Sequence, residues 1–244
     1  MGDTAKATRE MTFLLAEPER RFLRAVAAKV PGWLNSNHFT GLGVIGAIGC
    51  GAGYALSSHR PSWLWLACGM LVVNWFGDSL DGTLARVRRA ERPRYGYYID
   101  HIVDAFAIAA VGVGIGLSPY VRLDIALFMV LAYLTLSINV YLESAVFGVF
   151  KIAYGRVGPT EARLLLIVAT IVLWLSSTLL PGMFREVRFT ANAVVLVMAL
   201  AMFGSLVLRF ANNLHRLSKE EPRKRWRDRH RRAGDEAAGK GEGR

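Results

Sequence analysis

The chain alternates between long apolar stretches and short polar connections. Six stretches stay apolar over roughly the 20 residues that a helix needs to cross the hydrocarbon core of a bilayer. They cover about residues 40–57, 62–85, 96–118, 124–150, 161–181 and 189–213. Residues 35–40 hold types that favour helix starts, so the first helix is expected to begin near Thr40. The pattern predicts an all-α, polytopic membrane protein with six transmembrane helices.

An amphipathic segment at residues 15–31 precedes the first apolar stretch. Its apolar positions recur at near-helical spacing: Phe22, Leu23, Val26 and Val30. The opposite side is basic: Arg20, Arg21, Arg24 and Lys29. A helix with these two faces is suited to lie on an anionic membrane surface. We therefore expect an N-terminal amphipathic juxtamembrane helix.

Basic residues gather in alternate connections, and the formal net charge of +11 accompanies a hydrophobic content of 53%. The connection between the second and third stretches holds Arg86, Arg88, Arg89, Arg92 and Arg94. The connection between the fourth and fifth stretches holds Lys151, Arg156 and Arg163. Cytoplasmic loops of membrane proteins are enriched in Lys and Arg. Both termini and these two connections are therefore expected to face the cytoplasm.

Three regions follow from these patterns. Residues 1–38 are predicted to be a cytoplasmic segment with the amphipathic helix, residues 39–214 the six-helix membrane domain, and residues 215–244 a basic, disordered cytoplasmic tail. Attraction to anionic lipid accounts for a basic run directly after a membrane helix. A bare basic run is a weak motif for nucleic acid, so we expect no nucleic-acid partner.

Glycine is frequent in the first and third apolar stretches. The positions are Gly41, Gly43, Gly46, Gly49, Gly51, Gly53, Gly112, Gly114 and Gly116. Small residues at such spacings let helix backbones approach closely in lipid. They predict close packing, either within the bundle or between protomers. A dinucleotide-binding loop is excluded, because no strand pattern precedes these glycines.

Four carboxylates stand where the second and third stretches meet their basic connection. Asp78 and Asp81 are three residues apart, and Asp100 and Asp104 are four apart, so each pair shares one face of a helix. Ionised carboxylates at membrane depth are costly and usually have a function. Four acids directed at one point predict a divalent-metal site near the cytoplasmic boundary. The alternative is a salt-bridge network with the neighbouring arginines.

These acids belong to a longer pattern, D-x2-D-G-x2-A-R-x9-G-x3-D-x3-D, which runs from Asp78 to Asp104. The pattern resembles the signature of the CDP-alcohol phosphotransferases, and every fixed position of that signature is matched. The resemblance in arrangement covers about residues 15–215. It implies an enzyme in which an alcohol hydroxyl attacks a phosphorus of a CDP-linked donor and CMP leaves. It also implies a homodimer.

The resemblance implies roles for the matched residues. Asp78, Asp81 and Asp100 would bind metal, and Asp104 would bind a second ion, act as the general base, or both. The nucleotide and its phosphates would meet Gly82, Ala85 and Arg86. Gly96 would allow close packing where the third helix begins. Oxygen-only ligands favour Mg²⁺ or Mn²⁺, and we expect two ions.

Two further ionisable residues lie near this pattern. His101 shares a helix face with Asp104 and would be either a base or an orienting hydrogen-bond partner. Glu143, late in the fourth stretch, would be costly facing lipid and would instead bind an acceptor or take its proton. Thr160 is expected to cap the fifth helix, with Glu161 complementing its dipole.

The substrates allow two subtypes. Asp-His inside the motif and Gly-Pro-Thr-Glu before the fifth stretch look like the choline/ethanolamine phosphotransferase branch, which transfers a phospho-alcohol to a diacylglycerol-like lipid. The other branch transfers a phosphatidyl group from CDP-diacylglycerol to a polar alcohol. An anionic acceptor would require basic residues in the site, and the candidates are Lys151, Arg156 and Arg163.

Two other classes of protein compete with the enzyme. A cation-coupled transporter with an acidic ion site would show ionisable residues along a pathway and often internal repeats, and neither pattern is evident. A membrane scaffold with a basic tail would leave the four aspartates unexplained. The acids therefore favour the enzyme.

Overall fold

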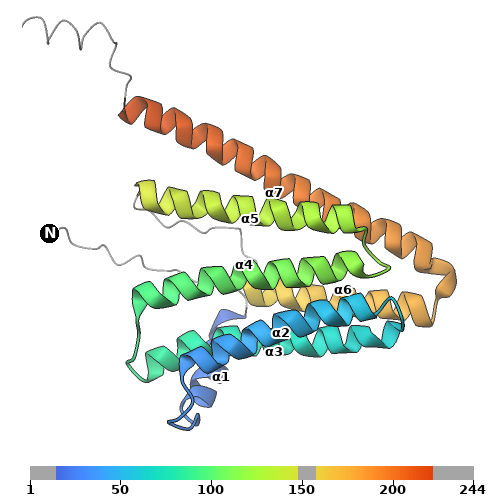
Figure 1. The fold of residues 1–244 in the computed structure, drawn as a ribbon, viewed down its shortest axis with the longest axis horizontal. Helices are drawn as coiled ribbons and strands as arrows, with labels where there is room; N and C mark the ends of the chain where they lie inside the picture. Colours follow the sequence, from blue (N-terminus) through green and yellow to red (C-terminus); the bar gives the residue numbers. More distant parts are fainter. Residues whose placement is uncertain (1–14, 148–157, 222–244) are drawn as a thin grey trace, which may run out of the picture. The chain divides into compact units, whose positions relative to one another are not determined.

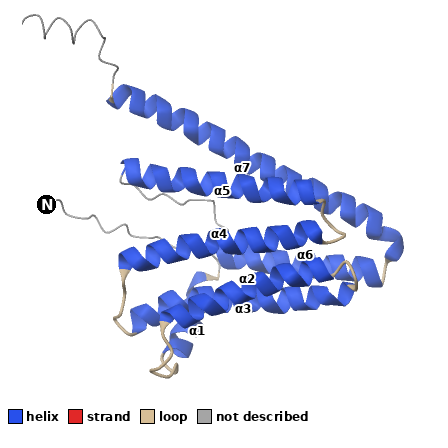
Figure 2. Ribbon diagram, in the orientation of Figure 1, coloured by secondary structure: helices blue, strands red, loops and turns tan. Residues whose placement is uncertain are grey.

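The computed structural model describes residues 15–147 and 158–221, and these are helical with no β-strand (Figures 1 and 2). The helices are α1 (Ala16–Ala27), α2 (Ser36–Leu56), α3 (Leu64–Val87), α4 (Pro93–Leu117), α5 (Leu123–Phe147), α6 (Pro159–Thr178) and α7 (Phe184–Glu220). Short 3-10 turns at Pro61–Trp63 and Pro181–Met183 precede α3 and α7. The all-α fold class is confirmed. The chain divides into two compact units after Phe203, within α7.

Each predicted apolar stretch corresponds to one of the helices α2–α7. Five of them, α2, α4, α5, α6 and α7, are long and apolar enough to cross a membrane. Helix α3 has 24 residues, but Asn74, Asp78 and Asp81 interrupt its apolar sequence. The protein is therefore an integral membrane protein by the length and composition of its helices. Six as the number of spans stays a prediction.

Two helix boundaries differ from the sequence prediction. Helix α2 begins at Ser36 rather than near Thr40. Asn35 is its N-cap residue, and the Asn35 amide donates to His38 Nδ1 at 3.0 Å. Helix α7 continues to Glu220, where Arg216 Nε donates to the Glu220 carboxylate at 2.8 Å. The first residues of the predicted disordered tail are thus helical.

Helix α1 is amphipathic as predicted, and the other membrane helices cover part of its apolar face. Leu23 and Ala27 are buried in a cluster with Phe39, Leu80 and Leu84. Phe22 stacks on Trp75 of α3 with ring centroids 6.4 Å apart. The basic side stays exposed, and Arg20 and Arg21 pair there with Glu17. Helix α1 is therefore fixed to α3, and its contact with an anionic membrane surface stays a prediction.

Glycines bring the backbones of α2, α3 and α4 together. A Cβ on Gly53 would lie 2.6 Å from the amide nitrogen of Ala67 in α3. A Cβ on Gly51 would collide with the Ala110 carbonyl of α4, and one on Gly114 with the backbone of Gly51. This confirms close packing within the bundle. The start of α2 lies against the second half of α3, because a Cβ on Gly43 would lie 3.3 Å from the Asp78 amide nitrogen.

Candidate active site

The four aspartates of the motif line one pocket. Its lining comes from α2, α3 and α4 and consists of Thr40, Gly43, Asn74, Asp78, Asp81, Asp100, Val103, Asp104 and Ala107. Helices α3 and α4 are joined by a short connection, so the end of α3 lies near the start of α4. The spacings of three and four residues put each acidic pair on one face of its own helix. The structure thus brings the four carboxylates together as the sequence predicts.

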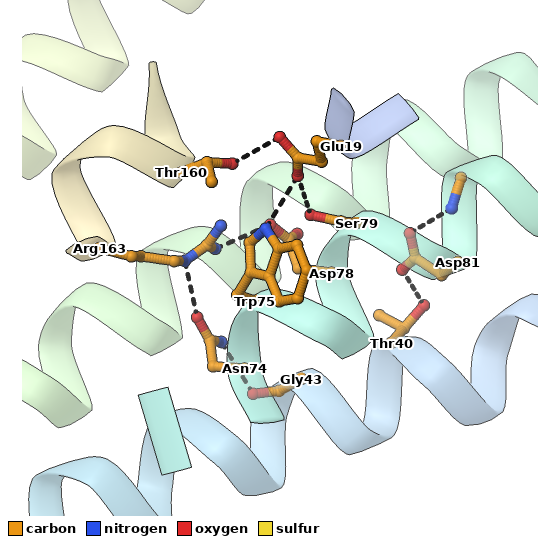
Figure 3. Close-up of polar contacts among 11 residues, drawn as sticks. Glu19, Thr40, Gly43, Asn74, Trp75, Asp78, Ser79, Asp81, Thr160 and Arg163 are labelled. Atoms are coloured by element: carbon orange, nitrogen blue, oxygen red, sulfur yellow. Dashed lines mark hydrogen bonds and ion pairs between the residues drawn. The ribbon is translucent and has the colours of Figure 1, made fainter. Parts of the chain in front are cut away.

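Asp81 is the most buried of these carboxylates and is held by two donors. The Thr40 hydroxyl of α2 donates to Asp81 Oδ2 at 2.6 Å, and the Gly82 amide donates to Oδ1 (Figure 3). A buried carboxylate requires such donors, because leaving it without them is costly. Thr40 is a lining residue that the sequence predicts only as a helix start. In the sequence, Thr40 is only a polar residue at the start of an apolar stretch. Such residues are too common to identify one that lines a pocket.

Asp78 forms an ion pair with α6. Arg163 Nη2 lies 2.7 Å from Asp78 Oδ2, and Arg163 Nε donates to Asn74 Oδ1 at 3.1 Å (Figure 3). Asn74 Nδ2 in turn donates to the Gly43 carbonyl at 2.9 Å. The chain of contacts links α2, α3 and α6 at the pocket. Asp78 thus pairs with a distant arginine, and the expected alternative, a network with the neighbouring arginines, does not describe this contact.

The remaining two carboxylates, on α4, differ in exposure. Asp100 is exposed, whereas Asp104, one helical turn further along α4, is partly buried. Asp100 lies nearer the start of the helix at Pro93, and Asp104 lies deeper. Among these two, Asp100 is the more accessible to a ligand arriving from the end of the bundle. Asp104 is closer to the buried part of the pocket, with Val103 and Ala107 beside it in the lining.

The donor set of the pocket suits a hard divalent cation. Carboxylate, hydroxyl and amide oxygens are the ligands that Mg²⁺ and Mn²⁺ prefer in proteins. As the side chains lie, no three His, Cys, Asp or Glu residues within 15–147 and 158–221 are grouped closely enough to hold one ion. Asp78 is directed to Arg163 and Asp81 to Thr40. These carboxylates would have to turn toward a shared ion, and the residues present fit that role.

The residues expected to meet the nucleotide lie at the end of α3. Arg86 is exposed, and its Nη2 donates to Thr83 Oγ1 at 3.1 Å. A Cβ on Gly82 would first meet the Arg86 guanidinium, at 3.4 Å. Gly96 differs from its prediction: a Cβ there would meet nothing within 4 Å, so the close packing expected of it is wrong. Its neighbour Tyr95 does contact α2, where Asn37 Nδ2 donates to the Tyr95 hydroxyl at 3.1 Å.

His101 and Glu143 lie outside the pocket lining. The His101 ring packs between Tyr97 and Tyr141, with centroid distances of 4.2 and 4.7 Å. Glu143 accepts a hydrogen bond from Asn139 of the same helix at 2.7 Å. Of the three candidates for acceptor binding, only one lies in the described part of the chain. Lys151 and Arg156 fall outside the described residues, whereas Arg163 reaches the site.

A second polar cluster, also unforeseen, adjoins the pocket. Glu19 of α1 accepts hydrogen bonds from Trp75 and Ser79 of α3 and from Thr160 of α6 (Figure 3). Thr160 does not cap α6 as predicted. The N-cap is Gly158, followed by proline at the first helical position. Glu161 accepts from the Gly158 amide at 3.0 Å, in agreement with its expected place at the helix start.

The fold and this pocket define a helical membrane protein with four acids at one end of its bundle. A sequence model described as CDP-alcohol phosphatidyltransferase matches residues 33–211, which is most of the chain. The chain therefore belongs to the CDP-alcohol phosphatidyltransferase family, and it is a transferase of substituted phosphate groups in phospholipid synthesis. The match does not distinguish a choline/ethanolamine branch. No curated protein matches the chain.

Proposed function

We propose that this protein catalyses the divalent-metal-dependent attack of an alcohol hydroxyl on a CDP-linked donor, with release of CMP. The observation that carries the proposal is the convergence of Asp78, Asp81, Asp100 and Asp104 on one pocket. The hydroxyl oxygen forms a bond to the donor phosphorus next to the alcohol or lipid group. The bond between that phosphorus and the bridging oxygen of the diphosphate breaks. The hydroxyl proton passes to a base, and CMP carries away the electron pair.

Each carboxylate has an assigned task in this proposal. Asp78, Asp81 and Asp100 would hold Mg²⁺ or Mn²⁺, which when bound neutralises the charge that develops on the diphosphate oxygens. Asp104 would share a second ion or accept the hydroxyl proton. Its place in the pocket lining favours it over His101, whose ring is enclosed by Tyr97 and Tyr141. A base must lie within hydrogen-bond reach of the proton that it takes.

Four other residues would contact the substrates: three at the end of α3 and one on α6. Gly82 and Ala85 leave room beside α3 for the nucleotide, because neither has a side chain beyond Cβ. Arg86 is exposed at the end of the helix and has the planar fork of donors that suits a phosphate. Arg163 orients Asp78 through their ion pair and keeps further donors for a substrate phosphate. Phosphate recognition by arginine is common to both subtypes of this reaction.

The first experiment measures CMP release by the purified protein from CDP-diacylglycerol, CDP-choline and CDP-ethanolamine. Each donor is tested with Mg²⁺, with Mn²⁺ and with a chelator. The proposal expects release from at least one donor, and only with metal. No release from any donor, together with ion flux in liposomes, would favour a transporter. Release that persists in chelator would contradict the metal role.

Lipid chromatography of the products separates the two subtypes. A CDP-choline or CDP-ethanolamine donor with a diacylglycerol acceptor yields a zwitterionic phospholipid. A CDP-diacylglycerol donor with a polar alcohol yields a phosphatidyl alcohol. Adding acceptors to the CDP-diacylglycerol reaction, with glycerol phosphate, inositol phosphate and serine tested in turn, identifies the polar alcohol. Whichever product forms names the donor and the acceptor together.

Three features of the setting are part of the proposal. Both termini and the pocket would face the cytoplasm, because the positive-inside rule assigns connections rich in Lys and Arg to that side. The basic tail contacts anionic lipid through its Lys and Arg residues, most of which lie outside the described part of the chain. The family resemblance supports a homodimer. Protease access in oriented vesicles tests the first feature, and chemical cross-linking in membranes tests the third.

A further inference from the structure

Glu19 is a carboxylate on α1 that contacts two other helices. Its Oε1 accepts from Trp75 Nε1 at 2.8 Å and from the Ser79 hydroxyl at 3.0 Å, both on α3. Its Oε2 accepts from the Thr160 hydroxyl of α6 at 2.9 Å (Figure 3). Glu19 thus satisfies three donors at once. None of the proposed substrate contacts involves it, and it does not line the aspartate pocket.

The donors to Glu19 are neighbours of the site residues. Ser79 follows Asp78 directly on α3. Thr160 lies three residues before Arg163 on α6, so the two share one face of that helix. Two residues of α6, about one turn apart on that helix, therefore link it to α3. One link is Thr160–Glu19–Ser79, and the other is the ion pair between Arg163 and Asp78.

A second bond fastens α1 to the start of α6. The Leu15 amide donates to Glu161 Oε1 at 3.1 Å, and Glu161 Oε2 accepts from the Gly158 amide. Both acidic residues, Glu19 and Glu161, thus lie at the N-terminal end of α6, where the helix dipole favours negative charge. The start of α6 is therefore tied to α1 by side chains from both helices.

The surroundings of Glu19 determine how much the loss of these hydrogen bonds would cost. It lies in a groove between α1, α3 and α6 that it shares with Trp75, Thr160 and Arg163. The rest of the lining is apolar and consists of Leu15, Pro18, Leu71, Val72, Leu164 and Ile167. Donors in apolar surroundings lose more when an acceptor is removed than donors in water do. Removing the carboxylate would leave the groups on α3 and α6 without their common partner.

We propose that Glu19 is a positioning residue for the phosphotransfer site. It holds the first turn of α6 against α3 and so fixes where the Arg163 guanidinium meets Asp78. Glu19 itself touches neither substrate nor metal. The inference rests on the proposed function, because the role that it assigns to Arg163 is part of that reaction.

Substitutions of Glu19 separate hydrogen bonding from charge. Glu19→Ala removes every acceptor and should lower kcat/KM for CMP release about tenfold, using the donor that the wild-type protein turns over fastest. Glu19→Gln keeps one acceptor oxygen for Trp75 and Ser79, and its amide can donate to the Thr160 hydroxyl, which also accepts. It should therefore restore activity to within about threefold of wild type.

Glu17→Ala is the matched control on the same helix. Glu17 is exposed and pairs only with Arg20 and Arg21 in the described contacts, so its removal should leave activity unchanged. A loss in Glu17→Ala equal to that in Glu19→Ala would overturn the proposal, since any acid on α1 would then serve. Failure of Glu19→Gln to recover activity would also overturn it.

A double-mutant cycle tests whether Glu19 acts through Arg163. If it does, Glu19→Ala should cost about tenfold in the wild-type background and less than twofold in an Arg163→Gln background. A purely structural role predicts the same tenfold loss in both backgrounds, and that result would contradict the proposal. The cycle compares ratios, so it remains informative even if each single variant is less stable than wild type.

Hydrogen exchange provides a test that does not depend on catalysis. Peptides covering residues 158–165 should exchange faster in Glu19→Ala than in wild type or Glu17→Ala, because the first turn of α6 has lost its anchor. Unchanged exchange would overturn the proposal. If the wild-type protein releases no CMP from any donor, the proposed function fails, while the exchange result still decides whether Glu19 anchors α6.

Discussion

Helices α2 and α5 differ in a way that explains where the site lies. Helix α5 is the more apolar of the two, yet only 28% of its most apolar stretch is buried, against 50% for α2. Helix α2 contacts α3 and α4 through glycines, so the backbones meet directly. In lipid, apolar side chains gain little by packing together, and close approach of small residues drives association instead. The small and polar residues of α2 thus mark the interior of the bundle, whereas the higher apolarity of α5 does not.

The same contrast holds for the polar side chains of these helices. Thr40 on α2 donates to a carboxylate of another helix, whereas Thr135 on α5 donates to the Leu131 carbonyl of its own helix. The polar groups of α2 and α3 thus link helices around the pocket. In α5, the Thr135 and Ser137 hydroxyls donate to carbonyls of the same helix, and Asn139 donates to Glu143 of that helix. Four substitutions in and around the pocket are each paired with a control outside the pocket lining.

The largest effect is expected from Asp100→Asn. Losing one ligand charge should lower CMP release at least a hundredfold while the protein still folds, because Asp100 is exposed and contributes little to packing. Asp124→Asn is the control, since Asp124 pairs with Arg122 at the start of α5. Turnover and thermal unfolding are measured for both. Near-normal CMP release by Asp100→Asn would show that Asp100 is not a metal ligand.

Arg163→Gln should lower kcat/KM about thirtyfold, because Asp78 would lose its ion-pair partner and substrate phosphates would lose a donor. Arg122→Gln breaks an exposed ion pair and should change activity less than twofold. The side chains of the first pair are 18% and 33% exposed, and those of the second are 63% and 62% exposed. Steady-state kinetics compare the two variants, and equal losses would contradict this ranking.

Gly46→Ala tests the backbone contact between α2 and α3. The added Cβ would lie 2.7 Å from Asn74 Cα, so the helices must separate. We expect a loss of about 1–3 kcal/mol in the free energy of unfolding and a roughly tenfold loss of activity. Gly41→Ala is the control on the same helix, because its Cβ would meet nothing within 4 Å. Denaturation and CMP release are measured for both, and equal stability would refute the contact.

The smallest effect is expected from Thr40→Val, which removes the hydroxyl that donates to Asp81 at 2.6 Å. The Gly82 amide still donates to this carboxylate, so activity should fall only about threefold. Thr135→Val on α5 should leave turnover unchanged. Initial rates at several metal concentrations measure both variants. A larger loss in Thr135→Val than in Thr40→Val would reverse the proposed distinction between the two helices.

The sequence allowed the helical fold and the four-aspartate cluster to be predicted, because both depend on local patterns. Hydrophobic runs locate the helices, and spacings of three and four residues define helix faces. The partners of those acids were not predictable, because Arg163 and Thr40 reach Asp78 and Asp81 from helices far away in the chain. The close packing expected at Gly96 is wrong for a related reason: the spacing of a motif does not show what lies opposite a glycine. Both the partners of the aspartates and the space around Gly96 depend on how distant segments of the chain pack together.

The most direct test of the central claim is Mn²⁺ binding, measured by electron paramagnetic resonance without substrate. Wild-type protein should bind Mn²⁺, and Asp78→Asn, Asp81→Asn, Asp100→Asn and Asp104→Asn should each weaken binding at least tenfold. Asp124→Asn should bind as the wild type does. A protein with all four aspartates of α3 and α4 changed to asparagine that still bound Mn²⁺ with wild-type affinity would contradict the account.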